Sequence, residues 1–97
     1  MINGMGYDYL LQQKKPEVAE AIFKANTILY PGSANVYDSY GEALAMNGKM
    51  KDSLHNYKKA VELAKENEDP NLEMFEDNLK KKKKFKKIVY ILTFFKT

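Results

Sequence analysis

The feature of this sequence that most constrains the fold is an internal repeat with a period of thirty-four residues. Three positions of a first unit recur at that distance in a second: Ala19 as Ser53, Phe23 as Tyr57, and Pro31 as Lys65. Gly6 recurs as Gly41 after thirty-five residues, so we expect one additional residue in the first helix. A fixed period of this length is typical of stacked helix-turn-helix units. The pattern predicts an all-α chain with units at about 1–32 and 33–67.

The second unit has the clearer helical pattern. Ser33 is predicted to cap its first helix, and Asn47-Gly48 is predicted to end it because both residues tolerate a left-handed backbone. Apolar residues at helical spacing predict the buried stripes of both helices: Val36, Tyr37, Tyr40 and Leu44 in the first, and Met50, Leu54, Tyr57 and Val61 in the second. Small residues at Gly41, Ala45, Ser53 and Ala60 indicate where the two helices approach closely.

The first unit repeats this arrangement less regularly. Pro16 is predicted to start its second helix, because proline is accepted in the opening turn, and Tyr30-Pro31 to end it. A further helix start follows at Asp69-Pro70, with an apolar stripe of Leu72, Phe75 and Leu79. This helix has no partner of its own kind within residues 1–79. We therefore expect it to cap the open end of the two units.

The second unit resembles the tetratricopeptide repeat. Counted from Ala34, seven of the eight signature positions match, namely Tyr37, Tyr40, Gly41, Leu44, Ser53, Tyr57 and Ala60, and Lys65 departs from the usual proline. The first unit matches at Ala19, Phe23 and Pro31, while Gly6 is one residue early and Asn26 replaces alanine. The resemblance implies an α-α superhelix of two repeats and a capping helix, acting as a scaffold that binds a protein partner.

A narrower resemblance concerns where such a module occurs. Gly6-Tyr7, Leu10-Leu11, the Phe23 to Asn26 spacing and residues 30–39 are similar to repeat pairs at the C-terminal end of bacterial serine hydrolases. The sequence contains no Ser-x-x-Lys or Gly-x-Ser-x-Gly motif, so the resemblance carries no hydrolase activity to this chain. An accessory domain of such an enzyme is therefore an alternative to a free adaptor.

Little in the composition indicates chemistry. The chain has no cysteine and one histidine, His55, so neither a metal site nor a thiol nucleophile is expected, and no cofactor is indicated. No nucleophile or carboxylate pattern accompanies His55, which we interpret as a surface or packing residue of a non-enzymatic protein. No signal peptide is visible in residues 1–6, which favours the cytoplasm, or the periplasm if the module belongs to a secreted hydrolase.

The tetratricopeptide resemblance implies that the first helix of each unit lines a concave groove. The predicted groove residues are Tyr7, Asp8 and Leu11 from the first unit and Asn35, Asp38, Glu42 and Met46 from the second. Asp38 and Glu42 lie four residues apart on one helical face, where they repel each other and favour a basic partner. The alternative interpretation is that both side chains are ordinary solvated residues of the helix surface. A chaperone-type carboxylate clamp is not expected, because the chain has no arginine.

The C-terminal segment, residues 80–97, differs in charge from the rest. It carries eight lysines and no acid, against thirteen acids and eight lysines in residues 1–79. Its lysines precede the apolar run of residues 88–95, which is too short to span a bilayer. We favour an extension of the capping helix whose apolar residues pack on the last repeat, ahead of a functionless tail and of membrane or nucleic-acid contact.

Two repeats are fewer than the three that repeat proteins usually need, so self-association is a further expectation. The leading hypothesis is a scaffold that binds a peptide or a neighbouring domain with basic residues. The hydrolase accessory domain is the first alternative. A membrane-peripheral protein that uses the lysine-rich tail is the second, and specific nucleic-acid binding is not expected because lysine contacts with phosphate carry no sequence information.

Overall fold

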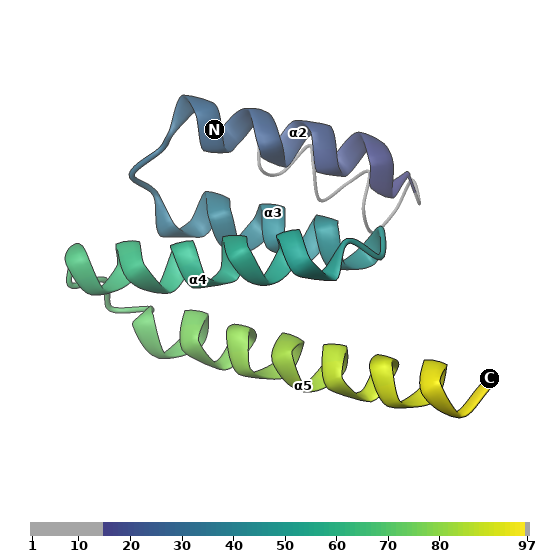
Figure 1. Ribbon diagram of the computed structural model, residues 1–97. Coiled ribbons are helices and arrows are strands. Elements are labelled where there is room, and N and C mark those ends of the chain that lie inside the picture. Colours follow the sequence, from purple (N-terminus) through teal and green to yellow (C-terminus); the bar gives the residue numbers. More distant parts are fainter. Residues whose placement is uncertain (1–14, 97) are drawn as a thin grey trace.

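The computed structural model describes residues 15–96, including the side chains of residues 15–94. This part of the chain consists of helices without strands: α2 (Pro16–Leu29), α3 (Ala34–Met46), α4 (Met50–Glu66) and α5 (Leu72–Lys96). Each helix runs antiparallel to the one before it, so α3 and α5 point in the same direction (Figure 1). The prediction of an all-α chain is confirmed.

The helix boundaries follow local chemistry. Pro16 opens α2, and Gly48 ends the turn after α3 with a φ of +78°, a left-handed conformation that glycine adopts without steric cost. Ser33 precedes α3 as predicted, but its side chain makes no capping hydrogen bond. Helix α5 begins at Leu72, two residues beyond the predicted Pro70, because the Asp69 carboxylate accepts a hydrogen bond from the Asn71 backbone N–H (2.8 Å) and forms a turn there.

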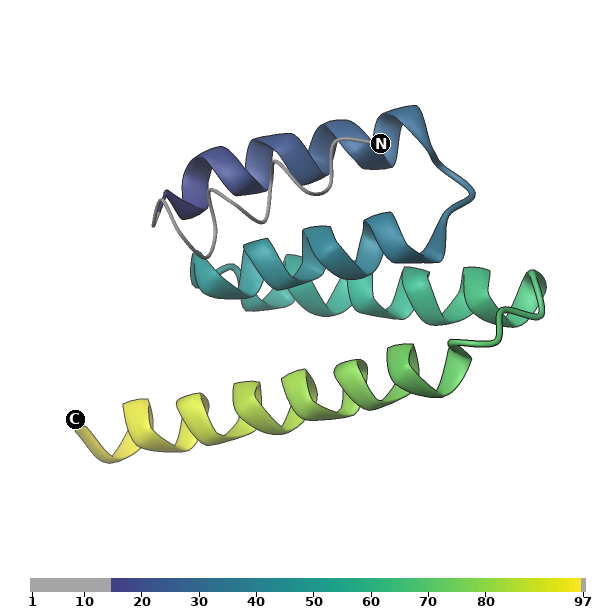
Figure 2. The ribbon, with the colours of Figure 1, turned by 180° about the vertical axis from the view of Figure 1, so that it is seen from behind.

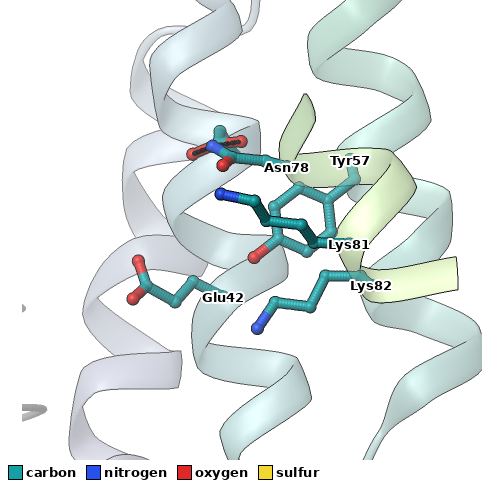
Figure 3. A pocket seen from close by; sticks show the side chains of 6 residues that line it. Glu42, Tyr57, Asn78, Lys81 and Lys82 are labelled. Atoms are coloured by element: carbon teal, nitrogen blue, oxygen red, sulfur yellow. Dashed lines mark hydrogen bonds between the residues drawn. The ribbon is translucent and has the colours of Figure 1, made fainter. Parts of the chain in front are cut away.

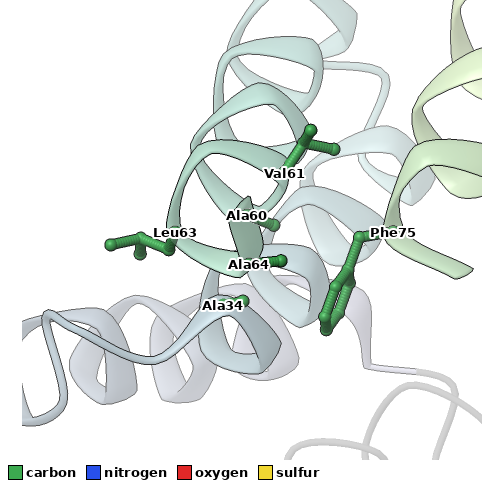
Figure 4. Packing of buried hydrophobic residues seen from close by; sticks show 6 residues of the cluster. All are labelled: Ala34, Ala60, Val61, Leu63, Ala64 and Phe75. Carbon is green, nitrogen blue, oxygen red and sulfur yellow. The ribbon is translucent and has the colours of Figure 1, made fainter. Parts of the chain in front are cut away.

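The main core lies between α4 and α5 and includes the start of α3. Figure 4 shows Phe75 of α5 reaching toward α4 beside Ala34 and Ala64. Phe75 is 2% exposed, and Leu72 and Leu79 pack against the same cluster. The apolar stripe predicted for Leu72, Phe75 and Leu79 is therefore confirmed. A second cluster joins α2 to α3 through Ala19, Phe23 and Ala43, with Tyr40 beside them.

Helices α3 and α4 approach each other closely at Gly41. A Cβ atom placed there would lie 3.1 Å from the Ser53 backbone oxygen and 3.1 Å from the Tyr57 ring. The Ser53 hydroxyl donates a hydrogen bond to the Gly41 carbonyl oxygen at 2.6 Å. The close approach that the small residues predicted is thus confirmed at Gly41 and Ser53, and a polar bond satisfies the buried Ser53 hydroxyl.

A polar cluster attaches α2 to the turn between α3 and α4. The Glu20 carboxylate accepts hydrogen bonds from Asn47 Nδ2 and from Lys49 Nζ, both at 2.9 Å. Asn47 Nδ2 also donates to the Pro16 carbonyl oxygen at 3.1 Å. Burial acts to raise the pKa of Glu20, but these hydrogen bonds and the Lys49 charge outweigh it and lower that pKa. The cluster fixes where α2 lies relative to the α3–α4 pair.

Replacing Glu20 with alanine is expected to lower the free energy of unfolding by about 1 kcal/mol, because two hydrogen bonds to its carboxylate are lost and solvent already weakens the one from the exposed Lys49. Urea unfolding would measure the change, with Glu17→Ala, at an exposed position of the same helix, as the matched control. A lowered pKa means that Glu20 stabilises the fold only while ionised, so the difference from wild type should shrink as acid protonates it. Equal effects of the two substitutions at neutral pH would contradict this role.

Candidate functional site

The predicted groove residues fall partly within the described structure. Asn35, Asp38, Glu42 and Met46 lie on α3 at spacings of three and four residues and so share one side of the helix. Asn35 and Met46 are exposed, Glu42 is half-buried and Asp38 is buried. Tyr7, Asp8 and Leu11 lie outside the described residues. The groove is therefore assessed on α3 and on the helix that faces it.

The sequence pattern predicted that Asp38 lies on an open surface. In the structure it is buried. Only 8% of the residue is exposed, because α5 covers it. Asn78 Nδ2 donates to both carboxylate oxygens of Asp38, at 3.1 and 3.3 Å. The pKa of Asp38 is raised to about 6: burial is the main cause and the nearby Glu42 charge adds to it, while the Asn78 hydrogen bond and the Lys82 charge act to lower it. Asp38 therefore helps to hold α5 against α3.

A cavity of about 170 Å³ lies at this junction. It is lined by Asp38 and Glu42 of α3, Tyr57 of α4, and Asn78, Lys81 and Lys82 of α5. Figure 3 shows the side chains of Lys81 and Lys82 extending from α5 toward the side of the cavity where Glu42 lies. The acidic face that the sequence predicted on α3 is thus opposed by lysines of the same chain. The cavity as a whole carries both signs of charge.

A second cavity, of about 300 Å³, continues along the same two helices. Its lining is Ala45 and Met46 of α3 with Lys82 and Phe85 of α5. Met46 is 52% and Phe85 50% exposed, so both offer apolar surface to a ligand. Lys82 lines both cavities, which makes them neighbours. We call the two together the α3–α5 groove: it is charged at the Glu42 end and apolar at the Met46 end.

Four groove residues on α5 were not identified from the sequence: Asn78, Lys81, Lys82 and Phe85. Their spacing of three, four and seven residues places them on one helical face, and this signal was present in the sequence. It was missed because the prediction assigned the groove only to the first helix of each unit. The predicted site was therefore half of the groove.

The groove offers carboxylate, ammonium and apolar contacts on rigid helices. His55 is exposed on α4 and does not line it. Within residues 15–96, no three His, Cys, Asp or Glu side chains are grouped closely enough to hold a metal ion. What the groove can do chemically is to bind side chains of both charges beside an apolar one.

Comparisons with known proteins give no match for this chain. Its sequence matches no protein-family model and no curated protein. No solved structure matches it either. Its function has to be argued from the residues of the groove and of the helices that form it.

Proposed function

We propose that the chain is a non-catalytic interaction scaffold, built as a tetratricopeptide-like repeat pair with α5 as its cap, and that it holds a peptide segment of a partner protein in the α3–α5 groove. The observation that carries this proposal is the groove itself, in which Glu42 and Lys82 stand beside the exposed apolar side chains of Met46 and Phe85. Such a combination provides an apolar anchor together with charges that fix the register of a peptide.

Burial at equivalent positions supports the repeat part of the proposal. Ala19 and Ser53, thirty-four residues apart, are both 0% exposed. Their aromatic neighbours Phe23 and Tyr57 are 0% and 2% exposed. Burial of the same positions in successive units is what a stacked repeat requires. In that arrangement α5 takes the place of the first helix of a next unit.

The charges of the groove define the peptide that it would accept. Glu42 favours a basic side chain, as the acidic residues of α3 predicted. Lys81 and Lys82 favour an acidic one on the opposite wall. An apolar side chain would enter the cavity between Met46 and Phe85. The expected peptide therefore has an apolar residue beside a basic and an acidic one. Its affinity should depend more on the order of these charges than on its net charge.

Selection from a displayed library of random peptides tests this proposal. Enriched peptides are expected to share an apolar residue flanked by charges. Met46→Asp should weaken the binding of a selected peptide about tenfold, because it places a carboxylate in the apolar cavity. Ile28→Asp is the matched control, since Ile28 is 72% exposed on α2 and lines neither cavity of the groove. Glu42→Lys should weaken binding as well and change which charge the peptide prefers.

Two results would contradict the proposal. One is the absence of any enriched peptide. The other is a set of peptides that bind the Met46→Asp and Ile28→Asp variants equally well, because the ligand site would then lie outside the groove. Circular dichroism of each variant establishes that the helices are intact before affinities are compared.

A further inference from the structure

The part of α5 from residue 88 to residue 94 exposes many large apolar side chains. Helix α5 is twenty-five residues long and α4 seventeen, and the C-terminal end of α5 extends past the other helices in both views (Figures 1 and 2). We call residues 88–94 the apolar tip. Its large apolar side chains are between 38% and 73% exposed: Ile88, Val89, Tyr90, Ile91, Leu92 and Phe94. The predicted extension of the helix is confirmed, but the predicted packing of these residues on the last repeat is wrong.

The apolar tip follows directly on a basic segment. Residues 80–87 contain seven lysines, which we call the lysine collar, and no acid occurs in α5 after Asp77. Lys83, Lys84, Lys86 and Lys87 are exposed and line neither cavity of the groove. Their charges are therefore available to a partner that is anionic. Such a partner must also accept the tip.

The distribution of apolar residues around the helix indicates what kind of partner fits. Residues 88–92 are consecutive and all apolar or aromatic, and successive residues of a helix point about 100° apart. They therefore cover every side of α5, whereas a protein groove contacts one face of a helix. A lipid phase surrounds a helix on all sides. The arrangement fits insertion of the tip into lipid better than docking against one face of a protein.

The tip is short compared with a bilayer. Seven helical residues extend about 10 Å at 1.5 Å per residue, whereas the hydrocarbon core of a bilayer is about 30 Å thick. No helix among the described residues is long and apolar enough to cross a membrane. From these observations we propose that α5 attaches the protein to the surface of an anionic membrane, with the apolar tip in one leaflet and the lysine collar among the lipid headgroups.

Two other occupants fit the observations less well. A nucleic acid would neutralise the lysine collar, but it would leave the apolar tip in water. Two tips packed together in a dimer would bring two sets of seven lysines close to each other, and like charges repel. An anionic lipid surface satisfies the collar and the tip at once. This inference does not depend on the peptide site, because the tip lies beyond the groove.

Co-sedimentation of the full chain with lipid vesicles tests the inference. Binding to vesicles of phosphatidylcholine mixed with phosphatidylserine is expected to be at least about tenfold stronger than binding to phosphatidylcholine alone, and to weaken in high salt. Two double variants are tested: Ile91→Asp/Leu92→Asp in the tip and Lys83→Glu/Lys84→Glu in the collar. Each should weaken vesicle binding about tenfold or more. These four side chains are exposed, so the fold should be retained, and circular dichroism checks this.

Matched controls make the same chemical changes elsewhere. Ile28→Asp/Leu29→Asp alters two exposed apolar residues of α2, and Lys51→Glu/Lys58→Glu alters two exposed lysines of α4. Both should bind vesicles like the wild type. The inference is overturned if the tip variant binds as well as its control, or if the wild type binds a DNA duplex but no vesicles. It is also overturned if sedimentation equilibrium shows tip-dependent self-association without lipid binding.

Discussion

A leucine in place of Gly41 is expected to lower the free energy of unfolding by about 3 kcal/mol. Even a Cβ atom at this position would lie 3.1 Å from the Ser53 backbone oxygen, which has no flexible end that could move aside. The further carbons of leucine would force α3 and α4 apart and break the hydrogen bond from the Ser53 hydroxyl to the Gly41 carbonyl oxygen. The higher helix propensity of leucine offsets only about 1 kcal/mol of this loss.

The matched control for this substitution is Gly32→Leu. No atom lies within 4 Å of a Cβ placed at Gly32, so the added side chain meets open space there. Urea unfolding followed by circular dichroism measures both variants. We expect the control to differ from wild type by less than about 0.5 kcal/mol. Equal stabilities of the two variants would show that the α3–α4 contact is not as close as the structure has it.

The sequence was sufficient to predict the parts of the fold that depend on local pattern. Asn47-Gly48 ends α3 because of backbone conformation, and Phe75 is buried because of helical periodicity. Each of these signals lies within a few residues of the feature it determines. The small residues at Gly41 and Ser53 likewise indicated where α3 and α4 approach each other closely.

The environment of Asp38 could not be predicted in this way. The sequence gives the face of α3 on which Asp38 lies, but what covers that face is Asn78, forty residues later. The contact depends on how α5 packs across α4, which is a matter of side-chain volumes at several positions together. The lysines were misassigned for a related reason. A run of identical residues has no periodicity of its own, so only the spacing of Lys81 and Lys82 from Asn78 and Phe85 indicates that they line the groove.

Substituting Asp38 with asparagine is expected to stabilise the protein near neutral pH and to flatten the pH dependence of its stability. The pKa of Asp38 is raised from 3.8 to about 6 in the folded chain, mainly because burial disfavours its charge. Above about pH 6, folding must therefore bury a carboxylate, and below about pH 4 it buries a neutral acid. The native state binds this proton more tightly than the unfolded state does. The contribution of Asp38 to the free energy of unfolding therefore becomes more favourable as pH falls from about 6 to about 4.

Raising the pKa of Asp38 from 3.8 to about 6 corresponds to about 3 kcal/mol. We therefore expect Asp38→Asn to exceed the wild type in free energy of unfolding by up to about 3 kcal/mol near pH 7, and the difference to vanish near pH 4. Asparagine keeps an oxygen that can accept the hydrogen bond from Asn78, so α5 should stay in place. Asp52→Asn, which removes the same charge from an exposed position on α4, is the matched control. Urea unfolding of the three proteins at a series of pH values measures this difference. If the free energies of unfolding of Asp38→Asn and wild type run parallel from pH 4 to 7, the prediction is wrong. Asp38 would then titrate as an ordinary surface carboxylate that α5 does not cover.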